Sequence, residues 1–479
     1  MAPHAVTDDE GVPEPSTNGV EERYKGHRSL PVPEPCLSYW HRTTRAFPYL
    51  NENSDEEVPT STKYLIIGSG LSGSFTAWSL VDSGVPGSDI VILEAREAVS
   101  GASGRNAGHC RPDAFRGFSA YAKVHGAEQA KKIVENEKLV FEKLDAFVRE
   151  HEVPCDLNST TTFDVCLTPE FAAYEKESFE AYKAAGGDVF HVNFYEGDEA
   201  RSRTKVKEAV AAYEWPAGSS HPAKLGQWLL TAVITKGVHL WTHCPATAVS
   251  KHLSRDMVET PRWNVRTPRG TIAAETVVHC TNAYASYLLP QLSTFVTPNR
   301  AQAHTFIRIA SLSGAKALDK TMSLRYSLRH FFSFMQRQGG WYCSLWHFAQ
   351  QPGVERGDDP KHIYNHEIAA TAAKAFQSLF VEAESKQRRH GEGADHYWTG
   401  IIAMTPDSVP MIGAVDGMDG QWICAGFNGH GMARIWTCAP GLVKLIKGEP
   451  WSATGLPECF EYSKERLEKN KNQELKSVW

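Results

Sequence analysis

The 479-residue sequence lacks several features that mark common classes of protein. No apolar run approaches the ~18–20 residues that span a bilayer, so we expect no membrane partner. The stretch 1–16 has no apolar core of the kind found in secretory signals. There is no C-x-x-C pair and no Cys/His spacing of a metal site, and we therefore predict no bound metal. No Gly-x-Ser-x-Gly occurs on a strand-to-helix elbow, which gives no support to a Ser/His/Asp hydrolase.

The sequence also has no block of charge of one sign. The net charge is −6, from 50 basic and 56 acidic residues that are interspersed, so we expect no nucleic-acid partner. The ten cysteines are scattered, and several lie in apolar runs, which is typical of buried free thiols. Free thiols favour a reducing compartment, and we predict a cytoplasmic protein.

What is present is a glycine-rich turn between a strand pattern and a helix pattern. Residues 64–67, YLII, form a short apolar run that is typical of a strand buried on both faces. Gly68, Gly70 and Gly73 then give G-x-G-x-x-G, and a helical pattern follows over 74–83. Glycines at these places allow the tight turn, the approach of a pyrophosphate and close packing of helix on strand.

A second apolar run, residues 90–93, ends in Glu94. A carboxylate at the end of the second strand binds ribose hydroxyls in dinucleotide sites. The free N–H groups at the start of the helix favour the negative pyrophosphate. The stretch therefore predicts a dinucleotide site; the alternative is a glycine turn that only joins packed elements.

The loop that follows distinguishes between dinucleotides. Residues 98–109 read AVSGASGRNAGH, a second glycine- and serine-rich turn that an NAD site does not need. The sequence resembles the D-amino-acid-oxidase-like (DAO) family of FAD-dependent oxidoreductases, and G-A-S-G-R-N-A-G most resembles the branch with gamma-glutamylputrescine oxidoreductase and its fungal relatives.

Further motifs carry the same resemblance. They are the strand 276–280 ending in Thr-Asn-Ala, the segment 298–302 with Ala301 where the family usually has glycine, HYWTGIIAMTPDSVPMIG from His396, and GFNGHGM from Gly426. The resemblance implies that FAD contacts Gly68, Ser69, Gly70, Leu71, Ser72, Gly73, Glu94, Ala95, Arg96, Ser103, Gly104, Arg105, Asn106, Ala107, Gly108, His109, Ala248, Val249, Thr281, Asn282, Ala283, Asp407, Asn428, Gly429, His430, Gly431 and Met432.

The resemblance also implies an α/β fold, in which a Rossmann-like FAD-binding domain is interleaved with an α+β substrate domain built on a mainly antiparallel sheet. We assign residues 62–150, 216–297 and 396–450 to the FAD-binding domain and 151–215 and 298–395 to the substrate domain. Residues 1–61 are expected to form an extended or partly disordered arm, and 451–479 a C-terminal tail. The apolar spacing predicts one long helix from Ser119 to about Glu152.

The family oxidises C–N bonds. By resemblance, a neutral amine or amino acid gives a hydride to flavin N5, water hydrolyses the imine, and oxygen or another acceptor reoxidises the flavin. The catalytic candidates are His430, in a glycine-rich turn that opens a helix, and His347 and Cys343, on an expected strand over the flavin. Cys343 stands where sarcosine-oxidase-like relatives have an oxygen-activating lysine, so we expect slow reoxidation by that route. A packed strand histidine is the alternative for His347.

Three residues are candidates for substrate contact: His347, Arg325 and Arg329. Either arginine can pair with a carboxylate through a two-pronged hydrogen bond, or can lie in solvent at a sheet edge. We expect noncovalent FAD, because Gly400 replaces the cysteine that links FAD in some relatives. His109 and His221 are the alternative attachment points. Two other functions stay open: a flavoprotein with structural or regulatory FAD, and an NAD-dependent dehydrogenase.

Overall fold

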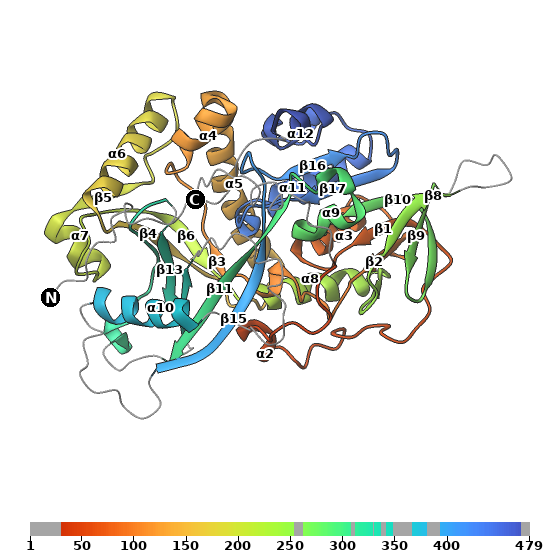
Figure 1. Cartoon of the computed structure of the whole chain (residues 1–479), viewed down its shortest axis with the longest axis horizontal. Helices are drawn as coiled ribbons and strands as arrows, with labels where there is room; N and C mark the ends of the chain where they lie inside the picture. Colours follow the sequence, from red (N-terminus) through yellow and green to blue (C-terminus); the bar gives the residue numbers. More distant parts are fainter. Residues whose placement is uncertain are drawn as a thin grey trace, which may run out of the picture.

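The computed structural model describes residues 30–252, 262–307, 312–328, 330–336, 342–347, 366–380 and 393–470. Two sheets organise these residues, one with eight strands and one with nine (Figure 1). The first sheet lies on the right of Figure 1. The long strands β11 (Thr297–Ile307) and β15 (Gly393–Met404) of the second sheet run diagonally to its left.

The first sheet has a parallel centre. Its strand order is β16 (Met411–Ala414), β17 (Gln421–Ala425), β10 (Gly270–His279), β1 (Ser61–Ile67), β2 (Ile90–Leu93) and β7 (His239–Trp241). Strand β1 pairs in parallel with both β10 and β2, which explains why its apolar run is buried on both faces. Strands β8 (Ala248–Lys251) and β9 (Trp263–Thr267) extend from β10.

Helix α3 (Leu71–Asp82) follows the glycine turn and packs against α8 (Pro222–Ile234) and α11 (Ile435–Ile446). These helices cover one face of the parallel sheet, and Phe75 of α3 stacks on Trp436 of α11. The carboxyl ends of β1, β2 and β10 therefore meet at one edge of a buried sheet, the usual place for a ligand in such folds.

The second sheet is mainly antiparallel. Its order is β15, β11, β14 (Tyr342–His347), β13 (Phe331–Gln336), β12 (Thr321–Arg325), β4 (Asn158–Cys166), β6 (Ala211–Ser219) and β3 (His109–Cys110), with β5 (Asn193–Glu196) beside β6. Only β12 and β4 pair in parallel among its described strands. Helices α6 (Pro169–Ala184), α7 (Gly197–Thr204) and α10 (His366–Leu379) complete this half. The predicted fold class is confirmed.

The single helix predicted over 119–152 is wrong. Two helices occupy this stretch, α4 (Phe118–His125) and α5 (Ala127–Glu150). Gly126 separates them with φ +84°, a conformation that glycine adopts easily and other residues rarely do. Because the apolar spacing continues across the break, periodicity could not detect it.

The domain bounds stay a prediction. Strand β6 crosses the expected boundary at residue 216, and β15 crosses the boundary at residue 396. At the N-terminal side, residues 30–61 run to β1 and include the short helix α2 (Tyr39–Arg42), and at the C-terminal side α12 (Lys464–Asn470) ends the described chain. Among the described helices, none is long and apolar enough to cross a membrane.

Candidate functional site

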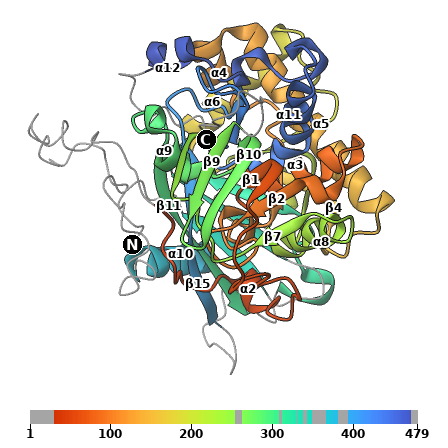
Figure 2. The ribbon, with the colours of Figure 1, turned by 90° about the vertical axis from the view of Figure 1, so that its right-hand side faces the viewer.

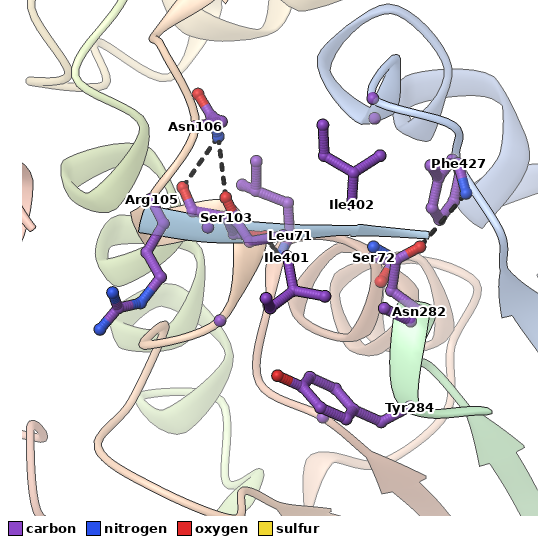
Figure 3. Close-up of a pocket in the computed structure, with 18 of the residues that line it drawn as sticks. Leu71, Ser72, Ser103, Arg105, Asn106, Asn282, Tyr284, Ile401, Ile402 and Phe427 are labelled. Carbon is purple, nitrogen blue, oxygen red and sulfur yellow. Dashed lines mark hydrogen bonds between the residues drawn. The ribbon is translucent and has the colours of Figure 1, made fainter. Parts of the chain in front are cut away.

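A cavity of about 320 Å³ lies where the carboxyl ends of β1, β2 and β10 meet the second sheet. Its walls come from the glycine turn, the loop after Glu94, strands β12, β13 and β15, and the turn before α11. Figure 3 shows side chains from several of these segments around the opening, including Leu71, Asn106, Asn282 and Ile402.

The glycine turn forms the floor of one end. Gly68 has φ +111°, and a Cβ there would lie 2.6 Å from the carbonyl oxygen of Cys280. A Cβ on Gly70 would lie 2.9 Å from Oγ of Ser103, and that Oγ accepts the backbone N–H of Leu71 at 2.8 Å. The turn at the start of α3 and the following loop therefore approach each other as closely as glycine allows.

Glu94 is buried beside the glycine turn. Its Oε2 accepts hydrogen bonds from the N–H of Ser69 at 3.1 Å and from Oγ of Ser69 at 2.7 Å, and its Oε1 accepts the N–H of Arg96 at 3.0 Å. A carboxylate has about four acceptor sites, so Glu94 keeps capacity for a ligand while it fixes both turns.

The loop 101–109 is held by its own side chains. Nδ2 of Asn106 donates to the carbonyl oxygen of Ser103 at 3.0 Å (Figure 3), and its Oδ1 accepts the N–H of Gly108 at 2.8 Å. His109 follows and lines the cavity, and both its ring nitrogens are buried without a hydrogen bond. Burial, together with nearby Arg111, lowers the pKa of His109 to about 3, so its ring is neutral.

The segment that follows β10 is hydrogen-bonded to the turn before α11. Oδ1 of Asn282 accepts the N–H groups of Gly426 at 3.1 Å and Phe427 at 3.2 Å (Figure 3). Asn428 is buried and fixes the same turn, because its Oδ1 accepts the N–H of Thr405 at 2.7 Å. The turn is therefore rigid where it faces the cavity.

His430 belongs to this turn and lines the cavity. Its Nδ1 lies 3.2 Å from Oε2 of Glu137, a fully buried carboxylate on α5, and Nε of Arg434 donates to Oε1 of Glu137 at 3.0 Å. Burial would raise the pKa of Glu137, but His430 and Arg434 outweigh it and the pKa is lowered. An ionised Glu137 accepts a proton-bearing Nδ1, so the geometry fixes the tautomer of His430.

Three arginines that line the cavity gather around one buried carboxylate. Oδ2 of Asp164 lies 3.1 Å from Nη2 of Arg111 and 2.5 Å from Nη1 of Arg116. Its Oδ1 accepts Nε of Arg325 at 3.1 Å. Despite burial, the three guanidinium groups hold the pKa of Asp164 well below its usual range. Burial and the Asp164 charge raise the pKa of neighbouring Glu175, which is therefore neutral.

This arginine cluster holds buried hydrogen-bond donors in the wall of the cavity. All three arginines line it, and Nε of Arg111 and Nη1 of Arg325 are buried without a hydrogen bond. Buried donors without partners are costly, so the wall favours an anionic group.

The structure brings most of the predicted site residues to the cavity. Those that do not line it are Ser69, Gly73, Gly104, Gly108, Ala248, Val249 and Asp407. The four in the glycine-rich turns lie directly behind lining residues. Pro245 and Ala246 line the cavity just before β8, and Asp407 is bound to Arg466 of α12 with Nε–Oδ2 2.7 Å.

Some predicted residues lie outside the described part. Arg329 is one of them. His347 and Cys343 lie on β14, where their backbones pair with β11 and β13, but their side chains lie outside the described residues. Among the other histidine candidates, His221 caps α8 and its Nε2 contacts Oγ1 of Thr43 at 3.0 Å, away from the lining.

Sequence reasoning missed Arg111 and Arg116. The available signal for a buried basic group was a pair of arginines directly after the glycine-rich loop, with the apolar residues Ala114 and Phe115 between them in HCRPDAFRG. It also missed Leu30 and Pro31, which line the cavity from the N-terminal arm.

Comparison with known proteins now decides the family. The model of the protein family described as "FAD dependent oxidoreductase" (DAO) matches residues 63–445 of this chain. The chain belongs to this family. It is 21% identical over 422 residues to the probable oxidoreductase OrdL of Haemophilus influenzae, covering 85% of this chain and 88% of that protein. It is 22% identical over 395 residues to gamma-glutamylputrescine oxidoreductase of Escherichia coli, covering 80% and 83% respectively.

Solved structures show the same fold. Glycine oxidase from Geobacillus kaustophilus has a TM-score of 0.65 at 17% identity, covering 82% of this chain and 96% of that one. L-proline dehydrogenase from P. horikoshii has a TM-score of 0.65 at 19% identity, covering 84% and 97% respectively.

The residues present fit the FAD that this family binds. The turn at Gly68 and Gly70 has no room for a Cβ, as a cradle for phosphates requires. Oγ1 of Thr281 and both ring nitrogens of His109 line the cavity as buried polar atoms without a hydrogen bond. These atoms are placed to contact a bound group. The chain is therefore an FAD-dependent oxidoreductase.

Proposed function

We propose that this enzyme oxidises a C–N bond of an amine that carries a carboxylate, such as an amino acid or an N-substituted amino acid. FAD, when bound, accepts the two electrons as a hydride, the imine product is hydrolysed by water, and oxygen or another acceptor restores the cofactor. The observation that carries the substrate class is the arginine cluster: Arg111, Arg116 and Arg325 around Asp164.

Its charge favours an anionic substrate. Three guanidinium groups surround one ionised carboxylate, and the second acid, Glu175, is kept neutral. Arg325 is only 2% exposed and lies over the ring of Phe331 at 4.0 Å, so its direction is fixed. A substrate carboxylate bound by Nη1 of Arg325 and Nε of Arg111 would satisfy two buried donors at once.

The other walls give the substrate an enclosed and partly apolar surrounding. Phe331, Met404 and Ile402 line the cavity beside the cluster. Such a surrounding excludes water and disfavours a charged amine, which supports reaction of the neutral amine. His430 also lines the cavity, and its Nδ1 lies 3.2 Å from the carboxylate of Glu137, which orients the ring.

The relatives support the chemistry. Gamma-glutamylputrescine oxidoreductase and dimethylglycine dehydrogenase are among the similar sequences, and glycine oxidase, L-proline dehydrogenase and L-amino acid deaminase are among the similar folds. By their names, these proteins act on amines or amino acids, and most of these substrates carry a carboxylate.

The test is anaerobic reduction of the purified flavoprotein by matched pairs of amines. Glycine, sarcosine and proline are compared with methylamine, dimethylamine and pyrrolidine, which lack the carboxylate. We expect members of the first set to bleach the oxidised-flavin absorbance and the second set to leave it unchanged. Arg325→Met should raise the half-saturating concentration by roughly thirtyfold or more, because a buried charge loses its partner.

Arg149→Met is the matched control, since Arg149 is exposed on α5 and pairs only with Asp145 at the surface. Bleaching by the decarboxylated amines at equal concentrations would contradict the substrate class. A flavin that stays oxidised with all amines would instead favour a structural or regulatory role for FAD.

A further inference from the structure

The N-terminal arm, defined here as residues 30–43, lies before the part of the chain that matches the family, which begins at residue 63. In space, the arm nevertheless packs along the loop formed by residues 96–108, which faces the cofactor cavity. This loop is named the cofactor loop. At one end of the arm, Leu30 and Pro31 line the cavity itself. At the other end lies helix α2, beside β15 (Figure 2).

Helix α2 donates hydrogen bonds to the backbone of the cofactor loop. Oγ of Ser38 donates to the carbonyl oxygen of Gly104 at 2.7 Å, and Nε1 of Trp40 donates to that of Asn106 at 2.6 Å. Ser38 is 0% and Trp40 1% exposed, so these bonds form away from water. Both acceptors belong to the loop segment whose side chains line the cavity.

A third contact involves His41. Its Nε2 lies 3.0 Å from the carbonyl oxygen of Val99, earlier in the same loop. A Cβ on Gly104 would overlap both Nε2 of His41 and the carbonyl oxygen of Val99. The arm and the loop thus fit together without room for a side chain at Gly104.

The loop also reaches out to the arm. Arg105 is 5% exposed, and its Nη2 donates to the carbonyl oxygen of Cys36 at 2.5 Å. Its other nitrogens donate to Ser100 within the loop (Nε, 2.8 Å) and to Thr399 of β15 (Nη1, 3.0 Å). One buried guanidinium therefore joins the arm, the loop and the second sheet.

From these contacts we propose that the arm is the outer wall of the FAD site: it clamps the cofactor loop in its FAD-binding conformation, and FAD leaves only after the arm detaches. Ser38, Trp40 and His41 are positioning residues that act through the loop rather than by touching FAD. Binding energies are reciprocal, so an arm that tightens FAD binding must itself be held more tightly when FAD is bound.

The first test removes single contacts in the full-length holoenzyme. Trp40→Phe removes the Nε1–H that serves Asn106 together with part of the packed ring; Ser38→Ala removes the donor to Gly104 and the acceptor of the His41 N–H. The measurement is the rate of FAD release, followed as the rise of flavin fluorescence after the holoenzyme is diluted far below the concentration at which FAD stays bound. Each variant should release FAD about tenfold faster, because a buried carbonyl loses its partner.

Arg42→Ala is the control on the same helix. Arg42 pairs with Asp395 of β15 at 2.6 Å in a partly exposed ion pair, and its guanidinium lies over the ring of Tyr39. Exposed pairs contribute little, so its release rate should stay within about twofold of the unmodified enzyme. Folded Trp40→Phe and Ser38→Ala proteins that release FAD at the unmodified rate would overturn the proposal.

The second test needs no variant. Trypsin cleavage after Arg42, in the arm, is compared between holoenzyme and deflavinated protein, with cleavage after Arg203 on α7 as an internal reference. We expect FAD to slow cleavage in the arm and to leave the reference unchanged, because an arm that tightens FAD binding is itself held more tightly when FAD is bound. Equal arm cleavage in both forms would refute the clamp, whatever the variants show.

Discussion

Oγ of Ser103 accepts the backbone N–H of Leu71 at 2.8 Å, and this bond joins the two glycine-rich turns of the cofactor site. Leu71 opens α3, so the loop after β2 supplies the helix with an acceptor that the helix itself lacks. The space between the turns is set by Gly70, whose missing Cβ would lie 2.9 Å from the same Oγ.

Gly70→Val should therefore yield protein without flavin. The branched side chain would crowd both Ser103 and the position of the pyrophosphate, and overpacking of this kind costs about 1–3 kcal/mol even before the cofactor is considered. The measurement is the ratio of flavin absorbance to protein absorbance after purification, with Gly70→Ala as the smaller step. A Gly70→Val protein that purifies fully yellow would contradict the position of the pyrophosphate.

Glu94→Ala should weaken FAD binding about tenfold or more, since one charge-assisted hydrogen bond is worth roughly 1.5–3 kcal/mol. Ser69 and Arg96 also lose the acceptor that fixes their N–H groups. Glu94→Gln keeps the shape and one acceptor oxygen, so its loss should be intermediate. Titration of deflavinated protein with FAD gives the dissociation constants, and an unchanged value for Glu94→Ala would exclude Glu94 as a ribose ligand.

The sequence predicted those parts of the site in which a single short segment contains all the residues of a binding feature. The turn at Gly68 and Gly70, the carboxylate of Glu94 and the loop around Asn106 each need only local spacing and glycine chemistry. The arginine cluster was beyond this reach, because Asp164 on β4 meets Arg325 on β12 only through a parallel strand pairing. The link between Glu137 and His430 is equally non-local.

The break at Gly126 and the docking of the arm show the same limit. The sequence does not reveal the sign of φ at a glycine within an apolar pattern, and it does not show the surface against which Tyr39 and Trp40 of the arm pack. That surface is built from Ala223, Ala301 and Trp398, which lie far apart along the chain.

FAD should separate from the polypeptide on acid precipitation. Gly400 lies on β15 and lines the cavity, so the position that carries a linking cysteine in some relatives has no nucleophile. The measurement is flavin fluorescence in the supernatant and in the denatured protein on a gel. Fluorescence that stays with the polypeptide would point to His109, which lines the cavity, and His109→Ala should then release it.

Acid should loosen FAD through His41. Burial, and next the positive charge of Arg105, lower the pKa of His41 from 6.5 to about 4; Arg96 acts in the same direction, while the carbonyl of Val99 and the carboxylate of Glu97 oppose it. A histidine whose folded pKa is lowered stabilises the fold fully above the unfolded pKa. That stability is lost as the pH falls from 6.5 towards 4 and below, up to roughly 3 kcal/mol.

Protonation leaves the Nε2–H on the carbonyl of Val99, but it places a buried positive charge near Arg105 and Arg96, and this destabilises the docked arm. FAD release should accelerate as the pH falls from about 6.5 towards about 4 in the unmodified enzyme. His41→Gln keeps an N–H donor and cannot titrate, so its release rate should change less over the same interval. His109 and His279 also have lowered pKa values but are common to both proteins, so the difference between the two pH profiles isolates His41. Superimposable profiles would show that the arm does not respond to this proton.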